Sequence, residues 1–414
     1  MSVDEHLFRR EAARIVAALT RIFGVHNLAL AEDVTQDVLC RALEVWRLRG
    51  IPDNPGAWLM AAAKHRAIDA IRRERTAKTF APELTRWLTT EWTLTPTLSE
   101  LFSEHAIEDD QLRMMFSCCS PKLPEEVQVA LVLNLLCGFS VSEIAAAFLT
   151  SAAAIEKRLS RGKKSLTRSG QLVEVSEARD VAARLPAIHR ALYLLFNEGY
   201  HGSSAEPTSL ELCHEALRLT LLLLKHPPSA TPVSHALLSL MCFHAARLPG
   251  RTDAEGNFTV LRDQDRTQWD AKLISRGLEH LDRASEDKEP NEYQLQAAIA
   301  AMHAHAPSVD QTPWNDIVTV YDALYALRPS PVVALNRAVA LGHAKGAEHG
   351  LTALRAIEDS DTLASYPFYF AAIGEFELRL GRKSNAHVQF KLALQHARGE
   401  KERQFLAQKL LACA

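Results

Sequence analysis

The stretch LPEEVQVALVLNLLCGFSVSEIAAAFLTSAAAIEKRLSRGKKSLTR, residues 123–168, decides the fold of the first part of the chain. Its opening proline and two glutamates suit the first turn of a helix, and Gly138 is expected to end that helix. Ser140 or Ser142 can cap a second short helix, VSEIAAAF, and a turn at residues 149–151 leads into a third. Three helices in this order predict a helix-turn-helix.

The third helix separates its apolar residues from its cations on a helical wheel of about 100° per residue. Its inner stripe holds Ile155, Leu159, Gly162 and Leu166. The opposite side holds Lys157, Arg161, Lys164 and Arg168, flanked by the small residues Ala153, Ala154 and Ser160. Small residues where a helix enters the major groove, followed by cations along the phosphates, are typical of a DNA recognition helix. The alternative is the ordinary solvated face of a surface helix.

A second basic helix is expected at residues 55–75. One of its faces holds Met60, Ala63, Ala67 and Ile71, and the other holds Trp58, His65, Arg66, Asp69, Arg72 and Arg73. A tryptophan beside arginines can stack on an unpaired base while the cations hold the backbone. Packing of Trp58 into the core against the preceding helices is an equally open interpretation.

The preceding helix, AEDVTQDVLCRALEVWR at residues 31–47, has an acidic and polar face. Its buried side is expected to hold Val34, Val38, Ala42 and Val45, and its other side Asp33, Gln36, Asp37 and Glu44. An acidic face does not favour DNA, so it indicates a basic protein surface as the partner. An ordinary solvated face is the alternative.

The composition narrows the class of protein. Of 414 residues, 47% are hydrophobic and 23% are charged, which is typical of a globular chain rather than a disordered one. Only 17 glycines and 18 prolines, with no sustained strand-period alternation, predict an all-α fold. The net charge of −3 hides two basic segments, residues 64–78 and 157–168, which indicate two separate contacts with a polyanion.

Targeting signals and metal motifs are not expected. The first residues mix charges and no stretch is long and apolar enough to span a membrane, so we expect a cytoplasmic protein. Seven cysteines indicate reduced core thiols. The alternative, a metal site formed by Cys118, Cys119 and His105, is opposed by the rarity with which adjacent cysteines ligate one ion. We therefore expect no metal and no cofactor.

In this order the segments resemble the ECF (extracytoplasmic-function) group of bacterial RNA polymerase sigma factors. Residues 31–46 resemble the helix of sigma region two that grips the polymerase clamp, and residues 55–75 resemble the segment that binds the promoter −10 element. Residues 123–166 resemble region four, which reads the −35 element. LPAIHRALYLLFNEGYHGS and LRDQDRTQWD, farther on, resemble the C-terminal extension of one ECF subgroup, which ends in a tetratricopeptide-like region.

The resemblance implies an organisation and a set of site residues. Residues 1–78 would be region two, 79–120 the linker that threads through polymerase, 121–170 region four, 171–290 a helical middle domain and 291–414 tetratricopeptide-like repeats. Core polymerase would be contacted by Asp33, Gln36, Asp37 and Glu44. The −10 DNA would be bound by Trp58, His65, Arg66, Arg72 and Arg73, and the −35 DNA by Ala153, Ala154, Lys157, Ser160, Arg161, Lys164 and Arg168.

The extension is expected to regulate the sigma portion. We expect residues 171–414 to fold back on region two, region four or the linker, helped by the high effective concentration of a tethered segment. Three acids of the LRDQDRTQWD loop, Asp263, Asp265 and Asp270, are candidates for contact with the basic helices. The alternative is that these acids are solvated or form local caps. Aligning Leu341-Gly342 with Leu380-Gly381 gives two helix pairs a period of about 39 residues.

Two rival functions remain open from the residues alone. A helix-turn-helix activator or repressor with a helical sensor domain would explain residues 123–414 but leaves the first 75 residues without a role. An enzyme in residues 181–300 would use polar candidates drawn from His189, Asn197, Glu198, His201, Asp263, Asp265 and Asp270. No metal-binding, nucleophile or phosphate-loop motif supports the enzyme, and His303 and His305 fit a solvated helix edge better than a ligand pair.

Overall fold

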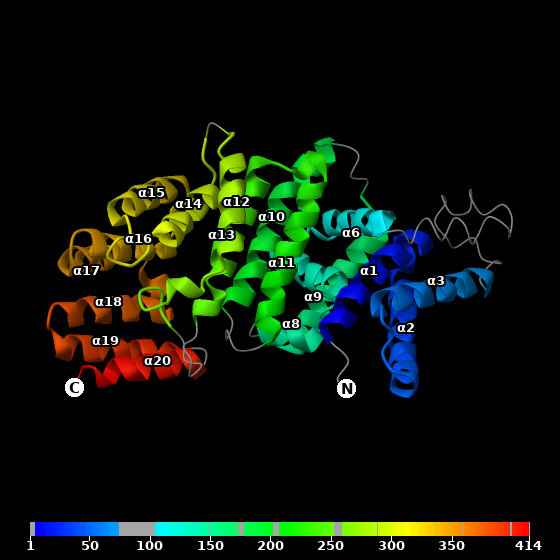
Figure 1. Cartoon of the computed structure of the whole chain (residues 1–414), viewed down its shortest axis with the longest axis horizontal. Helices are drawn as coiled ribbons and strands as arrows, with labels where there is room; N and C mark the ends of the chain where they lie inside the picture. The colour runs from blue at the N-terminus through cyan, green and yellow to red at the C-terminus, as the bar shows by residue number, and fades with distance from the viewer. Residues whose placement is uncertain are drawn as a thin grey trace. The chain divides into compact units, whose positions relative to one another are not determined.

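The computed structural model describes residues 5–73, 104–148, 150–170, 172–173, 178–201, 207–251, 259–287, 289–358, 360–397 and 400–413. Every regular element in these ranges is a helix, which confirms the all-α prediction (Figure 1). The chain forms two compact units. Unit 1 comprises Met1–Leu195 with Lys225–Ser229, and unit 2 comprises Phe196–Leu224 with Ala230–Ala414.

Unit 1 begins with three helices around one core. They are α1 (Glu5–Phe23), α2 (Leu28–Arg49) and α3 (Pro55–Arg73), with a 3-10 turn at Val25–Asn27 between the first two. Gly24 makes this break with a φ of 86°, a conformation that favours glycine. Leu19 and Phe23 of α1 pack in one apolar cluster with residues of α2 and α3.

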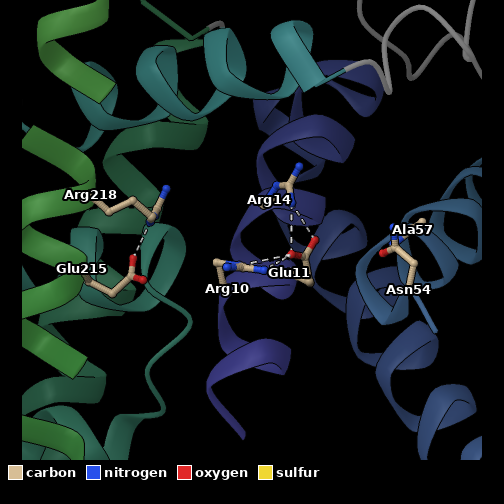
Figure 2. A network of polar contacts seen from close by, with 7 residues as sticks. All are labelled: Arg10, Glu11, Arg14, Asn54, Ala57, Glu215 and Arg218. Carbon is tan, nitrogen blue, oxygen red and sulfur yellow. Dashed lines mark hydrogen bonds and ion pairs between the residues drawn. The ribbon is translucent and has the colours of Figure 1, made fainter. Parts of the chain in front are cut away.

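A buried carboxylate of α1 lies close to the start of α3. The side chain of Glu11 is 1% exposed and accepts hydrogen bonds from Arg14 at 3.0 Å, with Arg10 also in reach (Figure 2). A Cβ on Gly56 would lie 3.3 Å from the Glu11 carboxyl, so a small residue lets the start of α3 approach it. Asn54 caps α3 there, its Oδ1 accepting from the Ala57 N–H at 3.0 Å.

The predicted helix-turn-helix follows α6 (Glu104–Cys118). It comprises α7 (Glu125–Leu131), continued by a π-helical turn at Val132–Leu136, then α8 (Val141–Ala147) and α9 (Ala152–Ser169). Ser140 rather than Ser142 caps α8: its Oγ accepts from the Glu143 N–H at 3.3 Å, and Glu143 accepts from the Ser140 N–H at 2.8 Å. Gly138 ends the first helix as expected, with a φ of 71°.

Side chains of unit 1 join the first three helices to the helix-turn-helix. Arg9 of α1 pairs with Glu143 and lies 5.0 Å from the centre of the Phe139 ring. On α9, Lys163 Nζ lies 2.5 Å from Glu32 Oε1 of α2. Arg21 of α1 lies 3.2 Å from Asp110 of α6.

The helix α10 (Ala178–His201) starts within unit 1. The Arg184 guanidinium donates to the Phe116 carbonyl oxygen at 3.0 Å, and Arg190 lies 3.2 Å from a Glu125 carboxyl oxygen. Just before α10, the Val173 N–H donates to Ser117 Oγ at 3.0 Å.

Unit 2 contains the remaining helices of the extension. They are α11 (Pro207–Lys225, up to Leu224), α12 (Pro232–Ala246), α13 (Ala271–Ala284), α14 (Glu292–His305), α15 (Trp314–Leu327), α16 (Pro331–Ala344), α17 (Ala347–Arg355), α18 (Pro367–Arg379), α19 (Lys383–His396) and α20 (Glu400–Leu411). Short 3-10 turns lie at Pro227–Ser229 in unit 1 and at Leu248–Arg251, Arg266–Gln268 and Ser360–Leu363 in unit 2. Successive helices from α15 onward pack on one another, and α18, α19 and α20 form a layered stack (Figure 1).

The repeat spacing in unit 2 differs from the predicted 39 residues. The helices α16 and α18 start at Pro331 and Pro367, and α17 and α19 start at Ala347 and Lys383, so each pair is offset by 36 residues. Gly342 lies inside α16 and a Cβ there would meet Phe376, whereas Gly381 follows the end of α18 with a φ of 76°. The two Leu-Gly pairs therefore occupy different structural positions, and their alignment was wrong.

The LRDQDRTQWD loop of unit 2 is largely structural. Asp265 caps a 3-10 turn by accepting from the Thr267 N–H at 3.0 Å, and Asp270 caps α13 by accepting from the Lys272 N–H at 2.8 Å. Asp263 is exposed. For two of the three acids, the structure therefore shows the local caps of the alternative interpretation.

Candidate nucleic-acid and protein interfaces

The helix α9 exposes the residues that its sequence pattern selects. Ile155, Leu159, Gly162 and Leu166 are buried, which confirms the predicted inner stripe. A Cβ on Gly162 would lie 2.7 Å from a Leu131 side-chain carbon, so the absence of a side chain lets α9 approach α7. Ala153, Lys157, Ser160, Arg161, Lys164 and Arg168 are exposed and Ala154 is half-buried.

The cations of α9 fall into two groups. Arg158 lies 2.6 Å from Glu126, and Lys163 lies 2.5 Å from Glu32, so these two charges already have partners. The other four, which we call the α9 cation stripe, form no ion pair within the described part of the chain: Lys157, Arg161, Lys164 and Arg168. An exposed stripe of unpaired cations on a helix is suited to contact with a polyanion.

The second basic helix, α3, exposes its predicted DNA-binding side chains to different degrees. His65 is exposed and Arg66 is half-buried. Arg72 and Arg73 are the last residues of α3, and their side chains lie outside the described set.

Trp58 of α3 is half-buried and packs against the first two helices. Its ring centre lies 5.5 Å from that of Trp46 at an angle of 66°, an edge-to-face arrangement. The structure thus shows the packing role that the sequence left open for Trp58. Its capture of a DNA base stays a prediction.

The helix α2 carries the acidic face. Asp33, Gln36, Asp37 and Glu44 are all exposed, and Val34, Val38 and Ala42 are buried as expected. Val45 is only half-buried. The Glu44 carboxylate lies 3.2 Å from Arg41, whereas Asp33 and Asp37 form no ion pair among the described residues.

Two leucines of α2 were missed by the sequence reasoning. Leu43 is 51% exposed and Leu48 is 82% exposed, and on the wheel they flank the acidic face. Single exposed leucines are ordinary, but a pair beside unpaired carboxylates is typical of a surface that another protein covers. The signal was present in the sequence, because both leucines lie off the buried stripe.

Three of the metal and enzyme candidates are buried side chains: Cys118, Cys119 and His189. Cys118 and Cys119 are buried, and burial raises the pKa of the Cys119 thiol to about 12. Burial also lowers the pKa of His189 to about 4. His303 is buried and stacks edge-on against Trp314, so the prediction of a solvated edge was wrong for it, although His305 is exposed.

No group of three or more metal-ligating side chains occurs among the described residues. The side chain of His105 lies outside that set. Among the described helices, none is long and apolar enough to cross a membrane.

Comparison with known protein families finds a match for each of the two helical groups of unit 1. Residues 7–77 match the family Sigma-70 region 2, and residues 113–166 match Sigma-70, region 4. Residues 184–285 match a family of unknown function (DUF6596).

Individual relatives agree with these matches. The RNA polymerase sigma factor CarQ of Myxococcus xanthus is 32% identical over 179 residues, which are 42% of this chain and 93% of CarQ. The ECF RNA polymerase sigma factor SigK of Mycobacterium sp. (strain KMS) is 35% identical over 75 residues, 17% of this chain and 36% of SigK. A Rhizobium meliloti (strain 1021) protein, Uncharacterized protein R00370, is 38% identical over 403 residues, 95% of this chain and 92% of its own length.

The match to CarQ spans nearly the whole of that sigma factor, and the two sigma families lie on the two helical groups that the structure joins in unit 1. Sigma factors are initiation factors rather than enzymes. The chain belongs to the ECF-type RNA polymerase sigma factors, and its role is in transcription initiation.

Proposed function

We propose that this sigma factor binds core RNA polymerase through the acidic face of α2, binds the −10 element through α3 and reads the −35 element through α9. Region two then corresponds to residues 1–78, the linker to 79–120 and region four to 121–170. Residues 171–290 form the middle part of the extension and residues 291–414 its tetratricopeptide-like repeats. The protein performs this role without a cofactor.

The observation that carries the proposal is the α9 cation stripe. Six cations lie on one helix, and only Arg158 and Lys163 are neutralised by carboxylates of the same unit. The stripe lies opposite the buried face, so a duplex can reach it without disturbing the core. Cations so placed contact phosphates along a groove, while the small residues at the N-terminal end let the helix approach the bases.

The test is run-off transcription with purified core polymerase on genomic promoter fragments. A variant with alanine at all four stripe positions should lose promoter-dependent transcripts while it still binds core polymerase. Arg158→Ala is the matched control, because it removes a paired cation from the same helix and should transcribe normally. Specific binding of promoter DNA by the chain alone, unchanged by core polymerase, would instead favour a helix-turn-helix activator or repressor.

We further infer that the extension regulates the sigma portion by contact within the chain. Support comes from the start of the extension, where Val173, Arg184 and Arg190 bond to Ser117, Phe116 and Glu125. Lys225, at the end of α11, lies 2.5 Å from Glu108 of α6. These bonds hold α6 and α7, the helices that support α9.

This regulatory proposal has its own experiment. Arg184→Met combined with Arg190→Gln removes two of these bonds without cutting the chain, and the run-off yield should change relative to the unaltered protein. Arg276→Gln is a control on an exposed position of α13, and it should leave the yield unaltered. An unchanged yield in the double variant, with its circular dichroism intact, would show that the contacts are structural only.

A further inference from the structure

A cavity of about 270 Å³ lies within unit 2, among the last helices of the extension. Its walls come from α16, α18, α19 and α20, with residues 260, 262 and 263 of the preceding loop at its rim. Most of the lining is apolar and includes Leu335, Ala372, Phe390, Phe405 and Leu406. A concave apolar site with a few polar groups is the usual form of a small-molecule site.

One end of the cavity carries three cations that converge on one carboxylate. Glu375 of α18 lies 3.2 Å from Arg262, 3.4 Å from Arg379 and 3.1 Å from Lys409. Burial acts to raise the pKa of Glu375, but Lys409, Arg379 and Arg262 together hold the pKa of this carboxyl below its ordinary value. Three cations around one anion leave local positive charge that a second anion can share.

The lining as a whole is balanced in charge, with three cations and three carboxylates, so the positive excess is confined to the end of the cavity at Glu375. Asp263 is exposed, and Glu402 lies seven residues before Lys409 on α20, about 10 Å away along the helix axis. A histidine near the cations responds to the same charge. Burial is the main cause that lowers the pKa of His343 to about 4, and the charges of Arg379 and Arg262 lower it further. Glu375 has the opposite effect and raises this pKa.

The volume limits the size of the occupant. A dry apolar cavity of about 150 Å³ holds benzene, so one of 270 Å³ holds a body of about eleven non-hydrogen atoms. We propose that the cavity binds a small amphipathic carboxylate, whose apolar body lies against Leu335, Phe390 and Leu406 and whose carboxylate lies on Arg379 and Lys409. This site goes beyond the sigma function, because it needs neither DNA nor polymerase.

Calorimetric titration of the full chain tests the site directly. The probes are 3-phenylpropionate, which has about the required size, and its neutral and cationic analogues 3-phenylpropionamide and 3-phenylpropylamine. The acid should bind at least about ten-fold more tightly than the amide, because a bond between charged groups replaces a neutral one. The amine should not bind. Because the readout is binding, its failure is separate from any failure in transcription.

Two variants locate the site. Lys409→Met should weaken 3-phenylpropionate at least about ten-fold, whereas Lys391→Met, which removes an exposed lysine of α19 outside the cavity, should have no effect. Ala372→Phe fills the cavity and should abolish binding. Equal binding of acid and amide would overturn the assignment to a carboxylate. Absence of binding by all three probes at millimolar concentration, or full binding by a folded Ala372→Phe variant, would overturn the site itself.

Discussion

The α9 cation stripe makes a quantitative prediction about salt. Each phosphate neutralised on duplex DNA lowers the slope of log affinity against log salt by about 0.9. If Lys157 contacts base edges and Arg161, Lys164 and Arg168 contact phosphates, replacing all four by alanine should make the slope of promoter binding less steep by about 2.7. A four-fold rise in salt lowers the affinity by about 3.5-fold for each phosphate contact. The variant should therefore lose about 3.5-fold less affinity than the unaltered protein for each contact that was removed.

The assay is fluorescence anisotropy of a labelled promoter with reconstituted holoenzyme at several salt concentrations. Contacts made by core polymerase are common to all variants, so they cancel in the difference of slopes. Arg158 is already paired with Glu126 at 2.6 Å, so Arg158→Ala should leave the slope unchanged. A fourfold variant that shifts the slope by less than about one unit, or an equal shift in Arg158→Ala, would refute the assignment of the stripe to phosphates.

Further predictions follow from single residues. Lys157, near the N-terminal half of α9, should change −35 sequence preference when replaced by alanine, as measured by selection from a randomised −35 library; a uniform loss across sequences would place it on phosphate. Asp37→Lys should weaken core polymerase binding in a pull-down titration while circular dichroism stays unchanged, since it sets a like charge against a basic partner; native affinity would move that contact elsewhere. Gly162→Ala should destabilise unit 1 by about 1–3 kcal/mol in urea melts, because a Cβ would lie 2.7 Å from a Leu131 side-chain carbon. Asp110 is buried, which raises its pKa from 3.8 to about 7 despite two nearby arginines. The folded state therefore retains the proton more readily than the unfolded state, and its contribution to stability is present below pH 3.8 and lost as pH rises to about 7. Urea melts should show this decline, and Asp110→Asn should remove it; an identical pH profile in the variant would mean that another group titrates.

The sequence predicted the local structure well because that structure depends on neighbouring residues. Gly138 ends its helix through a positive φ value, as expected, and the buried stripe of α9 follows directly from helical spacing. For Trp58 the local pattern was not sufficient, because its burial depends on a contact with another helix. Periodicity places it on the polar side of α3, but the partner that half-buries it, Trp46, belongs to another helix.

Long-range contacts left weaker traces in the sequence. Arg184 bonds to the backbone carbonyl of Phe116, an acceptor that every residue type carries, so no pattern marks the pair. The repeat period was misread because Gly342 and Gly381 look equivalent in sequence. One allows close helix packing and the other ends a helix. Glycine serves both needs, so alignment on glycine alone cannot separate them.

The compactness of unit 1 bears on how the proposed promoter contacts can be made together. The −35 and −10 elements lie about 25 base pairs apart, or about 85 Å of B-DNA at about 3.4 Å per base pair. In unit 1, Lys163 of α9 lies 2.5 Å from Glu32 of α2, and α2 and α3 share one core. A helix of 19 residues such as α3 is only about 28 Å long, so α3 and α9 cannot span that distance in this arrangement.

If α3 and α9 make the proposed contacts, binding both elements requires separation between the first three helices and the helix-turn-helix. The contacts to be broken include the packing of α1 on α6 and on the π-helical turn that follows α7. They also include the polar contacts of Lys163 with Glu32, Arg9 with Glu143 and Phe139, and Arg21 with Asp110. Because Arg184 and Arg190 hold α6 and α7 rather than α2 or α3, the start of the extension can stay with region four when the unit opens.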